Sequence, residues 1–328
     1  VSKVVDLIFD MKIGGTFSKP KISFGASSIK EQVKEKVTEV VDKAKEAAIA
    51  AASKIGGEQA LAALITRMTK GEENEVVDAA LIKGFLSFNG SINDEFARVM
   101  DVNAHARKIS KAVLTKRRIA DSASKILVWV DNGGDDSAIP ALTTNAVEKN
   151  FDKYCNLFEQ GRDVSKAIIK AIQNKPAAEQ AKMIQGRMDK AGAKKHLYYP
   201  VLAATGAKEA VAPIVEGYKS STGEAQKSAF EGLCALNDAS VLPTLLEATA
   251  NAELKDKAIA RYIELTGAST LNNDQKYMNY RKALETNPAL KYKNQALKAL
   301  SATQNYQAMM LASEYMDNAE TAQAAANT

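Results

Sequence analysis

The sequence is poor in the residue types on which many folds and sites depend. Its 328 residues include two cysteines, two histidines, one tryptophan and seven prolines, and only 6% are aromatic. Cys155 and Cys234 lie too far apart in sequence to indicate a disulfide framework, and we interpret both as small buried hydrophobic residues. No apolar run approaches the ~18 residues of a membrane-spanning helix. We therefore expect no transmembrane segment. The chain also begins without the basic and apolar regions of a signal peptide, so we interpret it as a fragment or a processed product.

Sequence motifs for catalysis are also missing. His105 and His196 are the only histidines, neither is followed by glutamate, and no set of metal ligands can be assembled by spacing. The sequence contains no nucleophile elbow, phosphate-binding glycine loop or paired-carboxylate signature. Trp129, in KILVWVDNGG, has the surroundings of a core residue. We therefore predict no catalytic residue, no metal site and no cofactor, and a chain that is not an enzyme by itself.

Helix-forming sequence makes up most of the chain. A hydrophobic content of 46% with few aromatic residues favours helices that pack closely through small side chains. From residue 57 onward, apolar residues recur at helical spacing between short turns, without a strand-like segment. The pattern predicts helices over 58–69, 74–88, 93–115, 117–131, 136–148, 149–159, 163–173, 177–191, 195–205, 208–219, 224–236, 239–250, 254–266, 274–286, 290–302 and 305–316.

Three similar phrases, each with a proline near a helix start, indicate an internal repeat. They read DDSAIPALTTNA (135–146), AKEAVAPIVEGY (207–218) and NDASVLPTLLEA (237–248). Each unit is a helix, a short turn and a second helix, repeated at roughly 30–40 residues, which is typical of a solenoid. Pro243 lies about one turn into its helix, where it bends the helix instead of breaking it. We predict that Leu242 and Leu245 are buried between adjacent helical pairs.

Residues 1–56 differ from the repeats in their sequence pattern. Residues 1–27 are β-rich and predict two or three short strands. Ser28 and Glu31 form a capping-box pattern at the start of a long, charged amphipathic helix over 28–56, which Gly56 and Gly57 terminate. We expect the apolar stripe of this helix to pack on a neighbour or to form a coiled coil. The stripe consists of Ile29, Val33, Val37, Val40, Val41, Ala44 and Ala48.

The three proline phrases, each joined to a helix such as AFEGLCAL or KAIARYIEL, resemble HEAT repeats over about 57–328. The resemblance implies an all-α fold, a right-handed α-α superhelix of the HEAT or armadillo type. More narrowly, the phrases resemble the arrays of exported bacterial proteins that carry a 3-keto-disaccharide hydrolase domain downstream. DMKIGGTFSKPKISFG followed by SIKEQVKEKVTEVV is similar to the C-terminal end of AsmA-like envelope proteins. Both resemblances imply a location in the bacterial envelope, in the periplasm.

Tyrosines are candidates for a partner surface. Most of them follow residue 195, and tyrosine offers a rigid apolar ring with a hydrogen-bonding tip. The same residue type also suits the half-buried rim of a repeat helix. The candidate partner surface consists of Tyr198, Tyr199, Tyr277 and Tyr280.

Basic residues are candidates for an anion surface. They outnumber acidic residues across 98–118, and basic clusters on helices can neutralise phosphates. Such clusters are also common on solvated helix faces, and this one lacks interleaved aromatic residues for base stacking. The candidate anion surface consists of Arg107, Lys108, Lys111, Arg117 and Arg118.

These observations favour a non-enzymatic helical-repeat scaffold that presents an extended surface to a protein or envelope partner. One alternative is an accessory repeat region of a carbohydrate-processing hydrolase whose catalytic domain is not in this chain, in which case carbohydrate is a partner. A second alternative is binding of nucleic acid or another polyanion through the basic helices. The net charge of +5 is modest for this length and favours nucleic acid least.

Overall fold

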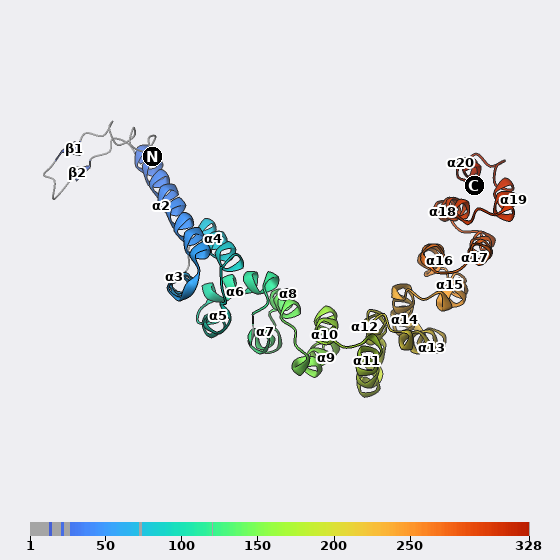
Figure 1. Cartoon of the computed structure of the whole chain (residues 1–328), viewed down its shortest axis with the longest axis horizontal. Helices are drawn as coiled ribbons and strands as arrows, with labels where there is room; N and C mark the ends of the chain where they lie inside the picture. The colour runs from blue at the N-terminus through green and yellow to red at the C-terminus, as the bar shows by residue number, and fades with distance from the viewer. Residues whose placement is uncertain (1–12, 15–20, 23–26, 72–73, 120, 328) are drawn as a thin grey trace. The chain divides into compact units, whose positions relative to one another are not determined.

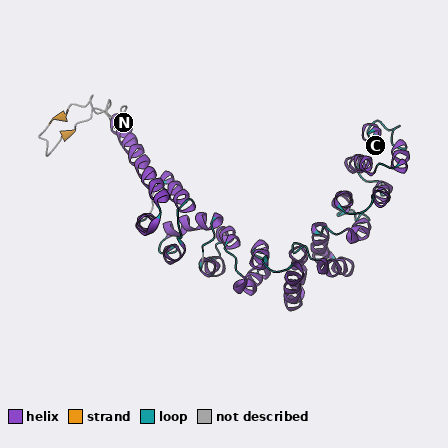
Figure 2. Ribbon diagram, in the orientation of Figure 1, coloured by secondary structure: helices purple, strands orange, loops and turns teal. Residues whose placement is uncertain are grey.

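The structure is a computed structural model that describes residues 13–14, 21–22, 27–71, 74–119 and 121–327. Most of these residues are helical, as the purple ribbon in Figure 2 shows, and the all-α prediction is confirmed. The chain divides into two compact units, Val1–Asn145 and Ala146–Thr328. The boundary falls inside the range 57–328, where the sequence predicts a single array of repeats.

A short antiparallel pair of strands lies near the N-terminus. β1 (Ile13–Gly14) pairs with β2 (Lys21–Ile22), with Ile13 opposite Ile22. Apart from Ser27, which begins a helix, the other residues of the β-rich segment predicted over 1–27 lie outside the described residues.

Alternate helices of the first unit pack on one another. The helices α2 (Ser27–Ile55), α4 (Glu75–Leu86), α6 (Ala104–Lys116) and α8 (Ile139–Thr144) form such a row, in which each contacts the next. The sequence predicts one helix over 93–115, but the structure has two, because the Asn103 side chain accepts a hydrogen bond from the Ala106 amide at 2.7 Å and starts a new helix. The helices of this unit are α2 (Ser27–Ile55), α3 (Gly57–Thr69), α4 (Glu75–Leu86), α5 (Asn93–Val99), α6 (Ala104–Lys116), α7 (Ser122–Asp131) and α8 (Ile139–Thr144).

The long helix α2 approaches α4 closely at Gly84. A Cβ atom at this position would lie 2.7 Å from the Ser53 hydroxyl oxygen and 2.9 Å from a methyl carbon of Ile49, so glycine is required for the contact. Ile49 and Ser53 are buried, whereas Val37 and Val41 of the predicted stripe are 53% and 46% exposed. α4 therefore covers a different face of α2 from the predicted stripe, and Val37 and Val41 are not packed against it. The alternative expectation, a coiled coil, stays a prediction.

The second unit continues the same kind of packing between helices that are close in sequence. Consecutive helices such as α13 and α14 pack together, and so do alternate helices such as α16 and α18. The last helix was not among those that the sequence predicts. The helices are α9 (Phe151–Glu159), α10 (Ser165–Ile172), α11 (Ala177–Ala191), α12 (Tyr199–Ala203), α13 (Val211–Ser220), α14 (Gly223–Ala235), α15 (Leu242–Ala248), α16 (Lys255–Ala268), α17 (Asn273–Glu285), α18 (Leu290–Leu300), α19 (Tyr306–Ser313) and α20 (Ala322–Ala326).

The prolines lie at a corner that recurs in the chain. Pro140 and Pro243, from two of the three similar phrases, each follow a 3-10 helix and are the second residue of an α-helix, as is Pro200. Pro213, from the remaining phrase, also follows a 3-10 helix but is the third residue of α13 (Val211–Ser220). Before Pro243, the Leu242 amide closes the 3-10 turn on the Ala239 carbonyl. An α-helix leaves its first amides without an intrahelical partner, so a proline here removes no α-helical hydrogen bond. The sequence predicts Pro243 about one turn into its helix, but it is the second residue of α15 and lies nearer the start.

Side chains of later helices satisfy carbonyl groups at the ends of earlier ones. In the first unit, the Asn103 amide donates to the Thr69 carbonyl at the end of α3, at 2.8 Å. In the second unit, Arg261 of α16 donates to the Leu236 carbonyl just after α14, at 2.9 Å. The last carbonyls of a helix have no partner within it, so these bonds join neighbouring helical pairs.

Candidate functional site

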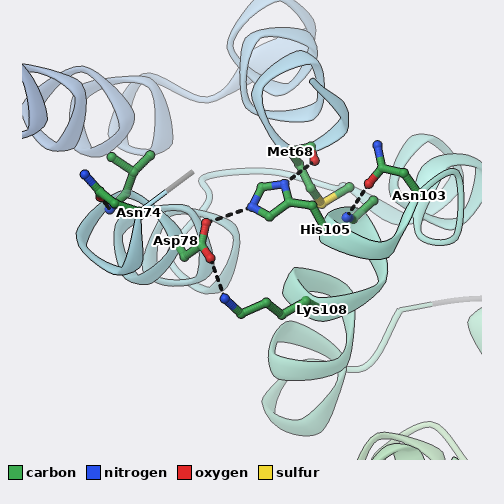
Figure 3. A network of polar contacts seen from close by, with 8 residues as sticks. Met68, Asn74, Asp78, Asn103, His105 and Lys108 are labelled. Atoms are coloured by element: carbon green, nitrogen blue, oxygen red, sulfur yellow. Dashed lines mark hydrogen bonds and ion pairs between the residues drawn. The ribbon is translucent and has the colours of Figure 1, made fainter. Parts of the chain in front are cut away.

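A buried polar network joins three helices of the first unit (Figure 3). The Nε2 atom of His105, from α6, lies 2.7 Å from a carboxylate oxygen of Asp78, from α4. The Nδ1 atom of His105 lies 2.9 Å from the carbonyl oxygen of Met68, near the end of α3. The His105 and Asp78 side chains are only 3% and 6% exposed. The Lys108 ammonium reaches the second Asp78 oxygen at 2.8 Å.

Two asparagine caps place the charged side chains of this network. The Asn74 side chain accepts a hydrogen bond from the Val77 amide at 3.0 Å and begins α4, so Asp78 falls in the first turn of that helix. Asn103 begins α6 in the same way, and His105 is the second residue of this helix. Helix N-termini favour nearby negative charge, which suits Asp78.

Both ring nitrogens of His105 face hydrogen-bond acceptors. A backbone carbonyl can only accept a hydrogen bond, and so can an ionised carboxylate. The Nδ1 atom faces the Met68 carbonyl, and the Nε2 atom faces the Asp78 carboxylate. Asp78 thus joins the buried His105 ring to the Lys108 ammonium, which lies at the surface.

Electrostatics support an ionised Asp78. Burial disfavours its charge, but hydrogen bonds from Lys108 and His105 outweigh this and hold the pKa of Asp78 below its usual value. A charged pair buried between helices is strongly damaging to break, because one charge then remains without its partner. The network can therefore fasten α3, α4 and α6 to one another.

The predicted anion surface is mostly engaged within the first unit. Arg107 pairs with Asp101 at 2.6 Å, Lys108 with Asp78 at 2.8 Å and Lys111 with Asp135 at 3.0 Å. Arg117 donates to the carbonyl oxygens of Phe85 at 2.5 Å and Gly90 at 3.0 Å. Arg107 also lies over the ring of the buried Trp129, with its guanidinium carbon 5.7 Å from the ring centroid. Four of the five side chains are therefore engaged within the unit, although Arg107, Lys108 and Arg118 are exposed.

The four tyrosines predicted as a partner surface are buried. Tyr198, Tyr199 and Tyr280 are 0%, 4% and 2% exposed, and Tyr277 is 8% exposed. A ring that fills the space between helices cannot also meet a partner, so the structure corrects this prediction for the first three residues. Tyr277 differs, because its ring lines a hollow between α17 and α19.

A second buried network in the second unit explains why Tyr198 lies inside. The Tyr198 hydroxyl donates to a carboxylate oxygen of Glu159 at 2.7 Å. Arg187 of α11 donates to both carboxylate oxygens of Glu159, at 2.7 and 2.9 Å. The hydrogen bonds to Glu159 raise the pKa of Arg187, and burial raises the pKa of the Tyr198 phenol. The network joins α9 to α11, and its polar groups bond to one another. We therefore interpret it as structural.

The cysteines and the second histidine do not form a reactive site. Burial raises the pKa of Cys155 and of Cys234 to about 11, which keeps both thiols protonated. His196 is half-buried, and its Nδ1 atom lies 2.8 Å from the Ala193 carbonyl oxygen. Within the part of the chain that the structure describes, no group of three or more histidine, cysteine, aspartate or glutamate side chains is arranged to hold a metal.

Hollows lie on both sides of α17 in the second unit. One, with a volume of about 470 Å³, is lined by Pro243 of α15 and by Met278 and Lys282 of α17. The other, of about 320 Å³, lies between α17 and α19 and is lined by residues that include Tyr306 and Met310. Met278, Tyr306 and Met310 are 46%, 70% and 50% exposed. These large apolar side chains lie at the surface around α17 and form the strongest candidate for a binding site.

Sequence reasoning identified one residue of these hollows, Tyr277, and missed Tyr306 and Met310. The signal for them was the segment YQAMMLAS of α19, in which apolar residues occur around the whole helix. Only Ala308 and Ala312 of this helix are buried. A short helix that is apolar on all sides but buries only alanines leaves its large side chains exposed.

Among the described residues, no helix has both the length and the apolar character of a membrane-spanning segment. Comparisons with protein families, with curated proteins and with solved structures return no match to this chain. The resemblances to HEAT repeats, to exported hydrolase-linked arrays and to AsmA-like proteins therefore stay predictions.

Proposed function

We propose that this chain is a non-enzymatic helical scaffold, an α-solenoid, that binds a protein partner along α17. The observation that carries this proposal is the pair of hollows beside α17, with Met278, Tyr306 and Met310 exposed around them. Methionine and tyrosine are enriched at protein interfaces, and the flexible methionine side chain adapts to the shape of a partner. We propose the bacterial envelope as the setting, because the resemblance to exported proteins implies it.

Packing between near neighbours supports the solenoid form. Within each unit, most contacts join helices that are adjacent or next but one in sequence, and α3 with α6 is an exception one step further apart. Side chains such as Asn103 and Arg261 bond the end of an earlier helix. In repeat proteins, each repeat contacts only its neighbours, and the stack offers an extended surface for binding. The recurring proline corner at Pro140, Pro200 and Pro243 is consistent with one unit used several times.

Site-specific photo-crosslinking tests this proposal. We expect a benzophenone amino acid at Met310 or Met278 to give one discrete crosslinked product in bacterial cells that produce the protein. The same group at Asn251, an exposed residue that lines neither hollow, is the control and should give none. Replacing Tyr306 and Met310 with serine should reduce the product formed from position 278 by about tenfold, because two exposed apolar contacts are lost.

Two results would contradict the proposal. One is an identical crosslinking pattern from positions 310 and 251, which would indicate random collisions. The other is turnover by the purified chain, above a heat-denatured sample, in a panel of glycosidase and esterase assays.

A further inference from the structure

A stripe of apolar side chains along α2 has no covering element among the described residues. Val37, Val40, Val41 and Ile55 are 53%, 44%, 46% and 75% exposed, and Ala44, Ala47, Ala48 and Ala51 are exposed as well. At about 100° per residue, these eight positions fall within about 60° of one line along the helix. We name these eight residues the valine stripe. It extends over residues 37–55 of α2, the long helix labelled in Figure 1.

A different face of the same helix is the one that packs. Asp42, Ile49 and Ser53 are the buried residues of α2, and they lie about 120–160° around the helix from Val37. Ile49 and Ser53 meet Gly84 of α4, which allows the close approach described above. The helix is therefore anchored to its own unit by one face, while the valine stripe remains exposed on another.

Lysines border the valine stripe on both edges. Lys34 lies on one edge, and Lys36, Lys43 and Lys54 lie on the other, all of them exposed. Lys43 also pairs with Glu39 at 2.6 Å, one turn earlier. The acidic residues of this stretch lie on the far side of the helix from the stripe. They are Glu35, Glu39, Asp42 and Glu46.

We propose that the valine stripe binds an amphipathic helix of a partner protein, one that carries carboxylates along both edges of its apolar face. The lysine borders provide the charge complementarity for such edges, as glutamates and lysines do in coiled coils. The small alanines of the stripe allow two helix axes to approach closely. The residues that carry this interface lie in the first unit, so it is separate from the proposed site along α17.

Two other occupants suit the stripe less well. A second copy of α2 would bring like-charged lysine borders together, because its acidic residues lie on the far side of the helix. A lipid surface would favour tryptophan, phenylalanine or leucine on the apolar face, whereas this face offers valine, alanine and one isoleucine. An acidic helix satisfies both the borders and the small side chains.

Titration of the purified full chain with designed peptides tests the proposal. The probe is a fluorescein-labelled 28-residue helical peptide with alanine and leucine on one face and glutamate on both edges; the matched peptide has lysine at those edges. We expect the glutamate peptide to bind at least about tenfold more tightly than the lysine peptide. Its affinity should fall as salt is raised, because exposed charges are screened. Val41→Asp should weaken binding by about tenfold, since it places a charge in the apolar contact.

Matched variants keep the test specific. Glu35→Gln, on the far side of α2, should leave the affinity unchanged. Reversing three border residues, in a Lys34→Glu, Lys36→Glu and Lys43→Glu variant, should transfer the preference to the lysine peptide. All replaced side chains are exposed, and fluorescence of the buried Trp129 checks that the first unit stays folded.

Several outcomes would overturn the proposal. They are equal binding of the two peptides, an unchanged affinity after Val41→Asp, binding to phosphatidylglycerol vesicles in place of the peptide, and a dimer of the chain that Val41→Asp dissociates. None of them affects the crosslinking at Met278 and Met310, so failure here and failure of the α17 proposal can be told apart.

Discussion

Replacing Leu245 with alanine should lower the free energy of unfolding of the second unit by about 2–5 kcal/mol. Leu245 is completely buried in α15, so truncation removes apolar contacts and leaves a cavity. Leu242 is buried too, as the repeat pattern predicts, and so is Leu233 of the preceding helix α14. Stability in repeat arrays depends mainly on nearest neighbours. Hydrogen exchange should therefore accelerate in α14–α16 and stay unchanged in α2–α8.

Pro243→Ala is the matched control, two residues away in the same helix. Pro243 is exposed and lies at the start of α15, where an amide has no α-helical partner. The substitution should change stability by less than about 1 kcal/mol, mostly through the greater freedom of the unfolded chain. Equal damage from Pro243→Ala and Leu245→Ala in denaturant melts would show that the proline fixes something essential, and our account of the corner would be wrong.

Helix positions were predictable where turn residues mark both ends. The range 177–191 was predicted and α11 is Ala177–Ala191, because Pro176 precedes the helix and Gly192, with a left-handed φ of 57°, ends it. The break between α5 and α6 was missed. The intervening segment MDVN contains neither glycine nor proline, and the only local signal is the cap formed by Asn103.

Which face of a helix packs was less predictable than the helix itself. Periodicity identifies residues that share a face, and the residues of the valine stripe do share one. It does not show which face meets a neighbour. That choice depends on Gly84, which lacks a side chain and so makes room for α2. Gly84 is at least 31 positions in sequence from its contacts Ile49 and Ser53. A close approach of this kind is a property of two segments and is not visible in either alone.

The buried network has a signal in the sequence, although not at His105. The partners of His105, Asp78 and Met68, are 27 and 37 positions away, so its local sequence does not indicate them. Asp78, however, lies in the apolar run VVDAALI, and a lone acid in such a run needs a buried partner. The tyrosine prediction was wrong in the other direction, because it placed core residues at the surface. Tyr198, Tyr199 and Tyr280 pack in the core.

Asp78→Asn should lower the free energy of unfolding of the first unit by about 3 kcal/mol near neutral pH. The asparagine keeps the shape of the side chain but removes the negative charge that the buried His105 ring and the Lys108 ammonium contact. Fluorescence of Trp129, the sole tryptophan, reports on this unit during denaturant unfolding, because the residue is buried in α7. Asp131→Asn, the same change at an exposed position of α7, is the control and should alter stability by less than about 0.5 kcal/mol.

The pH dependence of this difference distinguishes the charge of Asp78 from its packing. The pKa of Asp78 is lower in the folded unit than in the unfolded chain, because Lys108 and His105 outweigh the effect of burial. The carboxylate therefore contributes its full stabilisation above the ordinary aspartate pKa of about 3.9, and loses it as the pH falls through the lowered value. The gap in stability between the natural protein and Asp78→Asn should be full at pH 5 and should narrow steadily below about pH 4. A gap that stays constant into strong acid would mean that Asp78 acts through its shape alone, and that its negative charge does not hold these helices together.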